Sequence, residues 1–347
     1  MKILFILGFY RPGKCGISDY VRLLSKQLEF LGHECSMINI NPGIGDSIAT
    51  ISESLPQCDV VSLQFSPYSF HPKGLPGKEL NMFGKALAGR HLQVMFHEIW
   101  IGAYPKAKLY ERWVGGRQRK QVLRFIGTAN PFAIHSTNSA ALNRLKLMGI
   151  DAKYLYLCGN IPWGNTRPPK RDDNTVTQVV FFGTPYYAFP YDLLFDRLNK
   201  SFIETNKSLK IRVLGNIRNK AGLEKLHKEA NKYGFAVKET GMLTTEEISY
   251  ELQAAQIGVA TTPYDILGKS GAAAAMMEHG LPIYTYDDGD TPRDKMFIFD
   301  SFKDQIFLLN DRNNTKKVLK ASRKQRKPFF NGVVHTTEKF LESVRRP

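Results

Sequence analysis

Short apolar runs alternate with amphipathic helical patterns in the first half of the chain, and this alternation restricts the fold more than any other feature. Apolar runs predict strands at residues 2–9, 34–40, 60–65, 93–96, 131–136 and 153–158. Helices are predicted between them, for example at residues 18–31, where Val21, Leu24, Leu28 and Leu31 form one stripe. Strands that alternate with helices imply right-handed crossovers and therefore a parallel sheet.

The alternation resumes after a polar, proline-bearing segment at residues 165–177 that predicts a linker. Further strands are predicted at residues 178–182, 210–214, 257–260 and 283–286, and helices at 224–233, 245–255, 272–279, 316–327 and 336–344. We therefore predict an α/β protein of two Rossmann-like, doubly wound parallel-sheet domains, residues 1–165 and 166–330, with a C-terminal helical segment at 331–347. A cleft between the carboxyl ends of the two sheets is the expected ligand site.

Net charge narrows the possible partners without identifying one. The chain has 347 residues and a formal net charge of +16, and residues 1–170 hold 21 Lys/Arg against 10 Asp/Glu. The excess in the first half predicts a basic face that could meet nucleic acid, anionic lipid or a phosphorylated substrate.

The cysteines and the apolar runs indicate the compartment. Cys15, Cys35, Cys58 and Cys158 form neither a CxxC pair nor a His/Cys cluster, which argues against a structural zinc site or a disulfide framework. No apolar run approaches the roughly 18 residues that span a bilayer, and the N-terminal run lacks a small-residue cleavage site. We expect a cytoplasmic protein, and the basic first half leaves open a peripheral position at the inner face of the membrane.

The stretch LGKSGAAAAMMEHGLP, residues 267–282, predicts a loop, a short helix and a stop at Pro282. Alanines leave almost no side chain, so something large must lie close to this helix. One explanation is a neighbouring helix or sheet. The other is an anion at the helix N-terminus beside Lys269 and Ser270, where free N–H groups and the helix dipole favour negative charge.

Two further candidates follow predicted strands in the first half. The glycine-containing loop at residues 8–20 leads to a helix N-terminus near Gly16 and Ile17, where backbone N–H groups can approach an anion. It matches neither GxGxxG nor GxxxxGK[ST], so a tight turn is the alternative. His97 stands at the carboxyl end of a strand, where its imidazole could bond a sugar hydroxyl or a phosphate oxygen. A structural histidine is the alternative there.

Residues 104–125 form a basic segment with interleaved aromatic residues. Such a segment suits a membrane surface or the phosphates of nucleic acid, and a solvated helix face is the alternative. The cations that define this candidate acceptor or membrane patch are Lys106, Lys108, Arg112, Arg117, Arg119 and Lys120.

Taken in order, several segments resemble the GT-B glycosyltransferases of the family-4-like, nucleotide-sugar-dependent kind. These segments are GFYRPGKCGISDYVRLLSKQLEFLGHE, FHEIW, LYLCGNIPW, VVFFGTP, KETGMLTTEEISYELQAAQIGVATTPYD and EHGLPI, and they span Met1 to about Asp287. The resemblance implies two domains that face a cleft, a final helix that crosses back to the first domain, and a retaining transfer of a sugar from a nucleoside diphosphate to a glycan or lipid-linked acceptor.

The resemblance also implies roles for particular residues. His97 would contact the transferred sugar, and Lys269 would meet the leaving diphosphate at the helix N-terminus. Lysine and helix dipole would neutralise that diphosphate, so neither a metal nor another cofactor is expected. The donor would be bound by Gly16, Ile17, Gly183, Arg218, Thr240, Gly241, Met242, Lys269, Ser270, Gly271 and Ala272.

Two departures from the family pattern leave other functions open. Many members carry paired glutamates where this chain has Leu267 and Ala275, so Glu278 is considered as a substitute. The basic residue that often follows the first donor-domain strand is also missing, and Arg218 or Lys220 could compensate. A degenerate sugar-nucleotide-binding homologue or a nucleotide-sugar epimerase on the same fold is the first alternative. A basic nucleic-acid-binding protein is the second, although no recognised nucleic-acid motif is present and no such partner is expected.

Overall fold

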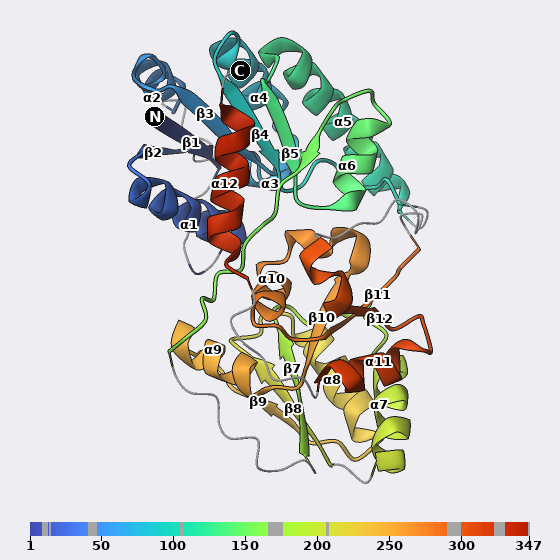
Figure 1. Ribbon diagram of the computed structural model, residues 1–347. Helices are drawn as coiled ribbons and strands as arrows, with labels where there is room; N and C mark the ends of the chain where they lie inside the picture. The colour runs from blue at the N-terminus through green and yellow to red at the C-terminus, as the bar shows by residue number, and fades with distance from the viewer. Residues whose placement is uncertain are drawn as a thin grey trace. The chain divides into compact units, whose positions relative to one another are not determined.

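The computed structural model describes residues 1–8, 13, 15–40, 47–104, 107–165, 176–205, 208–289, 300–322 and 330–345. The chain forms two compact units (Figure 1). The first comprises Met1–Leu157 together with Val333–Pro347, and the second comprises Cys158–Gly332. The first unit is therefore built from two separate stretches of the chain.

The first unit contains a six-stranded parallel sheet in the order β2-β1-β3-β4-β5-β6. The strands are β1 Lys2–Leu7, β2 Glu34–Asn39, β3 Val60–Phe65, β4 Leu92–Phe96, β5 Ala133–Ser136 and β6 Lys153–Tyr154. The helices are α1 Gly16–Phe30, α2 Ser47–Ser54, α3 Pro67–Phe70, α4 Gly77–Leu87, α5 Leu109–Ala129, α6 Ser139–Lys146 and α12 Gly332–Val344, with a 3₁₀ turn η1 at Leu55–Gln57. The central strands are buried on both faces, as continuous apolar runs require in a sheet covered by helices.

The last helix, α12, packs on the sheet of the first unit, where Figure 1 draws it in red. The ring of Phe340 stacks on that of Phe5 in β1, with the centroids 6.1 Å apart. Thr336 Oγ1 donates a hydrogen bond of 3.0 Å to the carbonyl of Tyr156, and the ring of His91 bonds the carbonyl of Val344 at 2.7 Å. Apolar packing and polar contacts thus hold α12 to residues that precede it by 180 positions or more.

The second unit contains another six-stranded parallel sheet, in the order β12-β11-β10-β7-β8-β9. Its strands are β7 Val176–Phe182, β8 Ser208–Leu214, β9 Val237–Glu239, β10 Ile257–Pro263, β11 Ile283–Tyr286 and β12 Ile306–Leu308. Its helices are α7 Tyr191–Thr205, α8 Lys220–Asn231, α9 Thr245–Ala254, α10 Gly271–Glu278 and α11 Asn314–Ser322, with 3₁₀ helices η2 Tyr264–Lys269 and η4 Asp300–Gln305. The two Rossmann-like parallel-sheet units confirm the predicted fold class.

The two faces of the second sheet carry different helices. Ile257 and Val259 of β10 belong to the apolar core shared with α7, α8 and α11. Gly258, between them, points to the other face, where a Cβ built on it would lie 2.8 Å from Sδ of Met276 in α10. Because successive residues of a strand point to opposite faces, α10 lies across the sheet from α7 and α11.

Candidate functional site

The predicted anion site lies at the start of α10. Ser270 is the N-cap of this helix, and its Oγ accepts a hydrogen bond of 3.2 Å from the backbone N–H of Ala273. The N–H groups of Gly271 and Ala272 in the first turn have no partner within the helix. Lys269, the last residue of η2, directly precedes the cap. The first turn of α10 therefore combines backbone donors, the positive end of the helix dipole and a lysine.

Protein backbone explains most of the alanine run. Ala273, Ala274 and Ala275 are buried, whereas Ala272 is partly exposed. A Cβ built on Gly159 would lie 2.7 Å from Cα of Ala275, so the chain at Gly159 runs directly against the helix. Of the two explanations left open by the sequence, the neighbouring protein segment applies at Ala274 and Ala275. Ala273 is buried as well, so only Ala272 remains open to a ligand.

Gly183 brings the carboxyl end of β7 to the first turn of α10. It has a φ of +97°, in the left-handed region that favours glycine. A Cβ built on it would lie 2.9 Å from Cβ of Ala272. Gly183, Ser270, Gly271 and Ala272 therefore gather in one place.

The remaining predicted donor residues form a second group at the same edge of the sheet, after β8 and β9. Gly215 pairs with Gly241 in an isolated bridge, and its N–H donates to Thr240 Oγ1 at 3.1 Å. Met242 is 82% exposed, and Arg218 is exposed in the turn before α8. These residues lie beyond the carboxyl ends of their strands, where ligands bind in parallel α/β sheets.

A lysine that was not predicted from the sequence contacts the loop after β7. Lys225 of α8 reaches this loop and donates hydrogen bonds to the carbonyls of Tyr187, at 2.9 Å, and Phe189, at 3.2 Å. Its Nζ also lies 4.9 Å from the ring centroid of Tyr187. Lys225 thus supplies the missing positive charge beside this loop, but its donors are engaged in holding the loop to α8.

Glu278 does not take the place of the missing family glutamates. It is the last residue of α10, about 10 Å along the helix axis from Gly271. Its Oε1 accepts a 2.7 Å hydrogen bond from the backbone N–H of Gly159. Leu267 and Ala275, which occupy the two glutamate positions, are both fully buried. The carboxylate at Glu278 therefore fixes the segment that enters the second unit and lies away from the first turn.

His97 lies in the first unit, directly after β4, and it is only 4% exposed. Burial lowers the pKa of His97 to about 3, so the ring is neutral at physiological pH. The ring of Tyr20 in α1 meets it edge-on, with the centroids 5.5 Å apart. Gly16 and Ile17 form the first turn of the same helix, so α1 brings its N-terminal turn to the strand end that carries His97.

A chain of buried hydrogen bonds extends from His97 across three strands. His97 Nε2 bonds Gln64 Oε1 at 2.9 Å, and Gln64 Nε2 donates to Ser62 Oγ at 2.8 Å. Ser62 Oγ donates to Gln93 Oε1 at 2.6 Å, and Gln93 Nε2 bonds His135 Nδ1 at 3.1 Å. No residue of this chain except His97 was singled out from the sequence, because its members come from β3, β4 and β5.

The direction of these bonds fixes the tautomer of His97. A glutamine Oε1 only accepts, so Nε2 of His97 must carry the proton. Nδ1 is then an acceptor, and it has no hydrogen-bond partner among the described residues. This buried Nδ1 therefore carries a lone pair, which suits a hydroxyl donor better than a phosphate oxygen.

The N-terminus of α1 differs from that of α10 in charge. Asp19 lies in its first turn, is buried, and accepts a 2.7 Å hydrogen bond from the N–H of Gly13. This carboxylate already faces the positive end of the helix dipole, so a second anion is less favoured here than at α10. Gly16 is exposed, and Ile17 is partly exposed.

The predicted basic patch lies on α5, except for Lys106, which is outside the described residues. Lys108 caps α5, and its backbone N–H donates to Glu111 Oε2 at 2.8 Å. The guanidinium of Arg117 lies 3.8 Å from the ring centroid of Trp113, which is 54% exposed. The cations Lys108, Arg112, Arg117, Arg119 and Lys120 are all exposed, next to exposed Leu109 and Tyr110.

The described residues contain neither a metal-binding cluster nor a helix that could span a membrane. No group of three or more His, Cys, Asp or Glu side chains that could hold a metal ion occurs among them. Likewise, no described helix is both long and apolar enough to cross a membrane.

The chain resembles known proteins in structure but matches none of them in sequence comparisons. No model of a known protein family matches the chain, and no curated protein matches it. Among solved structures, HepE of Anabaena in complex with UDP and glucose shares 15% identity over 99% of both chains, with a TM-score of 0.61. The lipopolysaccharide outer core galactosyltransferase WaaB, in its apo form, shares 14% identity over 99% of both chains, with a TM-score of 0.58.

A third similar structure is a putative UDP-N-acetylglucosamine 2-epimerase from Listeria monocytogenes. It shares 12% identity over 99% of this chain and 95% of its own, with a TM-score of 0.55. These neighbours extend over both units and the final helix. The structure and these likenesses together identify the chain as a protein of the GT-B glycosyltransferase fold.

Proposed function

We propose that the protein is a glycosyltransferase that moves a sugar from a nucleoside diphosphate sugar to an acceptor hydroxyl. The observation that carries the proposal is the capped first turn of α10, where Ser270, Gly271 and Ala272 meet Gly183 at the carboxyl edge of the second sheet. A diphosphate fits such a turn because two phosphate groups can bond its free N–H groups and the nearby Lys269. HepE, which has a similar structure, binds UDP and glucose.

In the proposed reaction, backbone donors and Lys269 stabilise the charge that develops on the leaving diphosphate. These groups would serve without a divalent cation. Nδ1 of His97 accepts a hydrogen bond from a hydroxyl of the transferred hexose and so orients the sugar. Retention of configuration rests on the family resemblance of the sequence.

The buried Leu267 and Ala275 determine which parts of the nucleotide the protein can bind. Neither position offers an acid to the ribose, so the proposed donor contacts fall on the diphosphate and on the group formed by Gly215, Thr240, Gly241 and Met242. We infer that the diphosphate contributes most of the donor affinity. A nucleoside monophosphate should then bind far more weakly than the diphosphate of the same base.

A thermal-shift panel tests the donor site first. UDP, GDP, ADP, dTDP and CMP are each added with and without magnesium. A ligand at 100 times its dissociation constant stabilises a protein by about 2.7 kcal/mol. A shift with one diphosphate that does not depend on magnesium supports the proposal and identifies the base. If none shifts the unfolding temperature at millimolar concentration, the proposal gives way to a degenerate site.

An epimerase on the same fold is the second candidate, because one similar structure carries that description. The two reactions differ in their products. An epimerase converts the sugar nucleotide with no acceptor present and releases no free diphosphate. A transferase releases the nucleoside diphosphate and depends on an acceptor. Chromatography of the nucleotide pool after incubation separates them.

We also propose that the exposed face of α5 meets an anionic membrane, where a glycan or lipid-linked acceptor for cell-surface polysaccharide would be presented. Its cations and the exposed rings of Tyr110 and Trp113 together support this. Trp113→Ser should reduce retention on anionic vesicles at low salt, whereas Phe30→Ser, at an exposed aromatic elsewhere in the same unit, should not. If anionic vesicles do not retain the parent protein at low salt, the membrane proposal is wrong. Tight, salt-dependent binding to random DNA would favour nucleic acid instead.

A further inference from the structure

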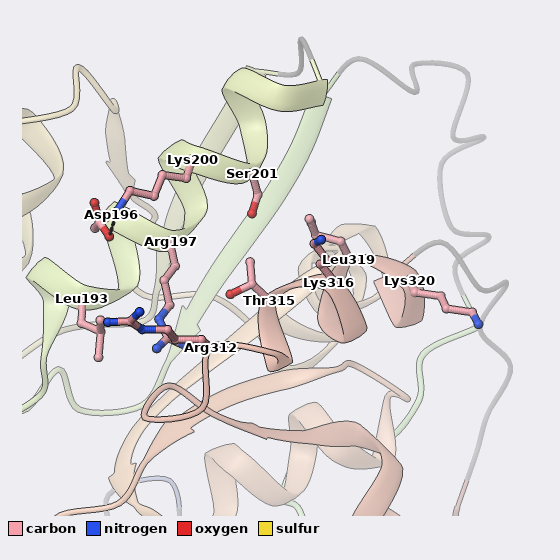
Figure 2. A pocket seen from close by; sticks show the side chains of 10 residues that line it. All are labelled: Leu193, Asp196, Arg197, Lys200, Ser201, Arg312, Thr315, Lys316, Leu319 and Lys320. Atoms are coloured by element: carbon pink, nitrogen blue, oxygen red, sulfur yellow. Dashed lines mark hydrogen bonds and ion pairs between the residues drawn. The ribbon is translucent and has the colours of Figure 1, made fainter.

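A basic groove lies between α7 and α11 of the second unit, and no part of the proposed reaction uses it. The cavity has a volume of about 800 Å³ (Figure 2). Arg197 and Lys200 of α7 line one wall. Arg312, just before α11, and Lys316 and Lys320 of α11 line the other.

The groove is separate from the proposed donor site. The helices α7 and α11 share the apolar core on one face of the second sheet, through Leu194, Leu198 and Val318. Helix α10 packs on the opposite face, where Met276 meets Gly258. A ligand in the groove would therefore lie across the sheet from the first turn of α10.

Positive charge in the groove exceeds negative charge. Asp196 is the one carboxylate of its lining, and it pairs with Lys200 at 2.8 Å. Arg312, Lys316 and Lys320 form no ion pair within the part of the chain that the structure describes. Like charges that line one cavity repel each other, so an anion that binds between them would relieve this repulsion.

Two guanidinium groups, those of Arg197 and Arg312, line the same part of the groove. Arg197 donates a hydrogen bond of 2.5 Å to the carbonyl of Asp311, the residue before Arg312. This bond ties α7 to the loop that carries the second arginine, and Figure 2 shows both guanidinium groups on this side of the cavity. Arginine forks match the oxygens of a phosphate group in a bidentate manner.

The lysines extend the site along α11. Lys316 and Lys320 are four residues apart, so they lie on the same helix face with about 6 Å of axial rise between them. A single phosphate at the two arginines would leave these ammonium groups unmatched. A ligand with a second or third linked phosphate would meet them as well.

We propose that the α7–α11 groove is a binding site for a compound with two or more linked phosphate groups. The compound is either soluble or the headgroup of a membrane lipid, since both present the same oxyanions. This site does not depend on the proposed donor site. Its role would be to hold a phosphorylated ligand or surface beside the second unit.

The test uses the full chain and two probes, inorganic tripolyphosphate in solution and phosphatidylcholine vesicles that contain diacylglycerol pyrophosphate, whose headgroup has two linked phosphate groups. Calorimetric titration measures the first, and cosedimentation measures the second. The double variant Arg312→Ser/Lys316→Ser removes two groove cations that are exposed and outside the core. Lys228→Ser/Lys303→Ser removes two exposed cations of the same unit that do not line the groove, so the net charge of the two variants is equal.

We expect the groove variant to weaken tripolyphosphate binding by about tenfold or more, which corresponds to about 1.4 kcal/mol, since two charge-assisted contacts are lost. The control variant should weaken it less than about twofold. Groove-dependent binding of tripolyphosphate alone assigns a soluble ligand, and groove-dependent binding of vesicles alone assigns a lipid. Equal losses in the two variants, or no binding of either probe by the parent protein, would overturn the proposal. A thermal shift that a nucleoside diphosphate induces in the parent protein should persist in the groove variant, which separates this result from any failure of the donor site.

Discussion

Nε2 of His97 lies 2.9 Å from Oε1 of Gln64, and this contact determines which nitrogen of the imidazole is left to meet a ligand. The chain that continues through Ser62 and Gln93 runs in a single donor direction. Each side chain in this series can donate its hydrogen bond only if the preceding side chain keeps its orientation. Residues of a neighbouring strand thus determine the tautomer of His97.

Ser62→Ala should break this chain at its centre. It leaves Nε2 of Gln64 and Oε1 of Gln93 without their present partner in a buried position, at a cost of about 1–3 kcal/mol in stability. The ¹⁵N shifts of the parent His97 should show a protonated Nε2 and an unprotonated Nδ1, and the variant should show a mixture of tautomers.

The matched control for this experiment is Ser136→Ala. Ser136 is also buried in the same sheet, but its Oγ donates to the carbonyl of Phe96 and takes no part in the chain. The control should lose stability and keep the parental ¹⁵N pattern. A parental pattern in Ser62→Ala would mean that the chain does not hold the tautomer.

The folded protein should become less stable as the pH is lowered below about 6.5, the ordinary pKa of histidine. Burial lowers the pKa of His97 to about 3, and burial together with the charge of Lys153 lowers the pKa of His135 to about 4. Between these values and 6.5 the unfolded chain binds protons that the folded chain does not. Stability contributed by the neutral rings is therefore complete above this window and is lost as the pH falls through it.

Each of the two histidines should contribute up to about 1.4 kcal/mol of lost stability per pH unit within this window. Urea unfolding at pH 7.0, 6.0 and 5.0 measures the slope. The double variant His97→Gln/His135→Gln should have a smaller slope, whatever its absolute stability. Equal slopes in parent and variant would show that other groups control the pH dependence.

Two substitutions of Ser270 separate helix capping from anion binding. Ser270→Ala removes the N-cap of α10 and should cost about 1 kcal/mol of stability. Ser270→Asp keeps a capping oxygen but places a negative charge at the proposed diphosphate site. The aspartate variant should therefore retain parental stability and lose most of its affinity for the nucleoside diphosphate. If this variant binds the nucleoside diphosphate as tightly as the parent protein, the donor site does not lie at the N-terminus of α10.

Gly222→Ala should destabilise the second unit severely. A Cβ built on Gly222 would lie 1.7 Å from the carbonyl oxygen of Pro185, so the loop after β7 or the first turn of α8 must move. The cost should exceed the roughly 1–3 kcal/mol that is typical of overpacking, because the obstacle is backbone. Gly116→Ala is the control. No atom lies within 4 Å of a Cβ built there, and alanine should stabilise α5 by about 0.5–1 kcal/mol.

The parallel α/β architecture could be predicted because the central strands are continuous apolar runs. The sequence also indicated α10, whose cap and stop are local. Helix α4 was not predicted, because Gly77 and Gly84 interrupt its strong helix formers. Close packing of Gly84 against Thr128 of α5 compensates for this weakness. The three-residue β9 has no apolar pattern of its own and exists because β8 pairs with it.

Helix α7 is a different omission, since its signal is present in the sequence. One buried face of this helix has apolar residues at helical spacing, namely Leu194, Phe195, Leu198 and Phe202, directly after an aromatic-rich loop. The polar chain behind His97 could not have been found in the same way. Gln64 and Ser62 are ordinary residues of a strand until the sheet places β4 and β5 beside it.

The attachment of α12 to β1 has a consequence for synthesis on the ribosome. Phe340 covers Phe5, yet all of the second unit is translated between them. The second unit can complete its own sheet as soon as its residues have emerged. The first unit must wait, with part of its apolar surface uncovered, until the final helix is released. A nascent chain arrested before α12 should therefore contain a mature C-terminal unit and an N-terminal unit that still recruits chaperones.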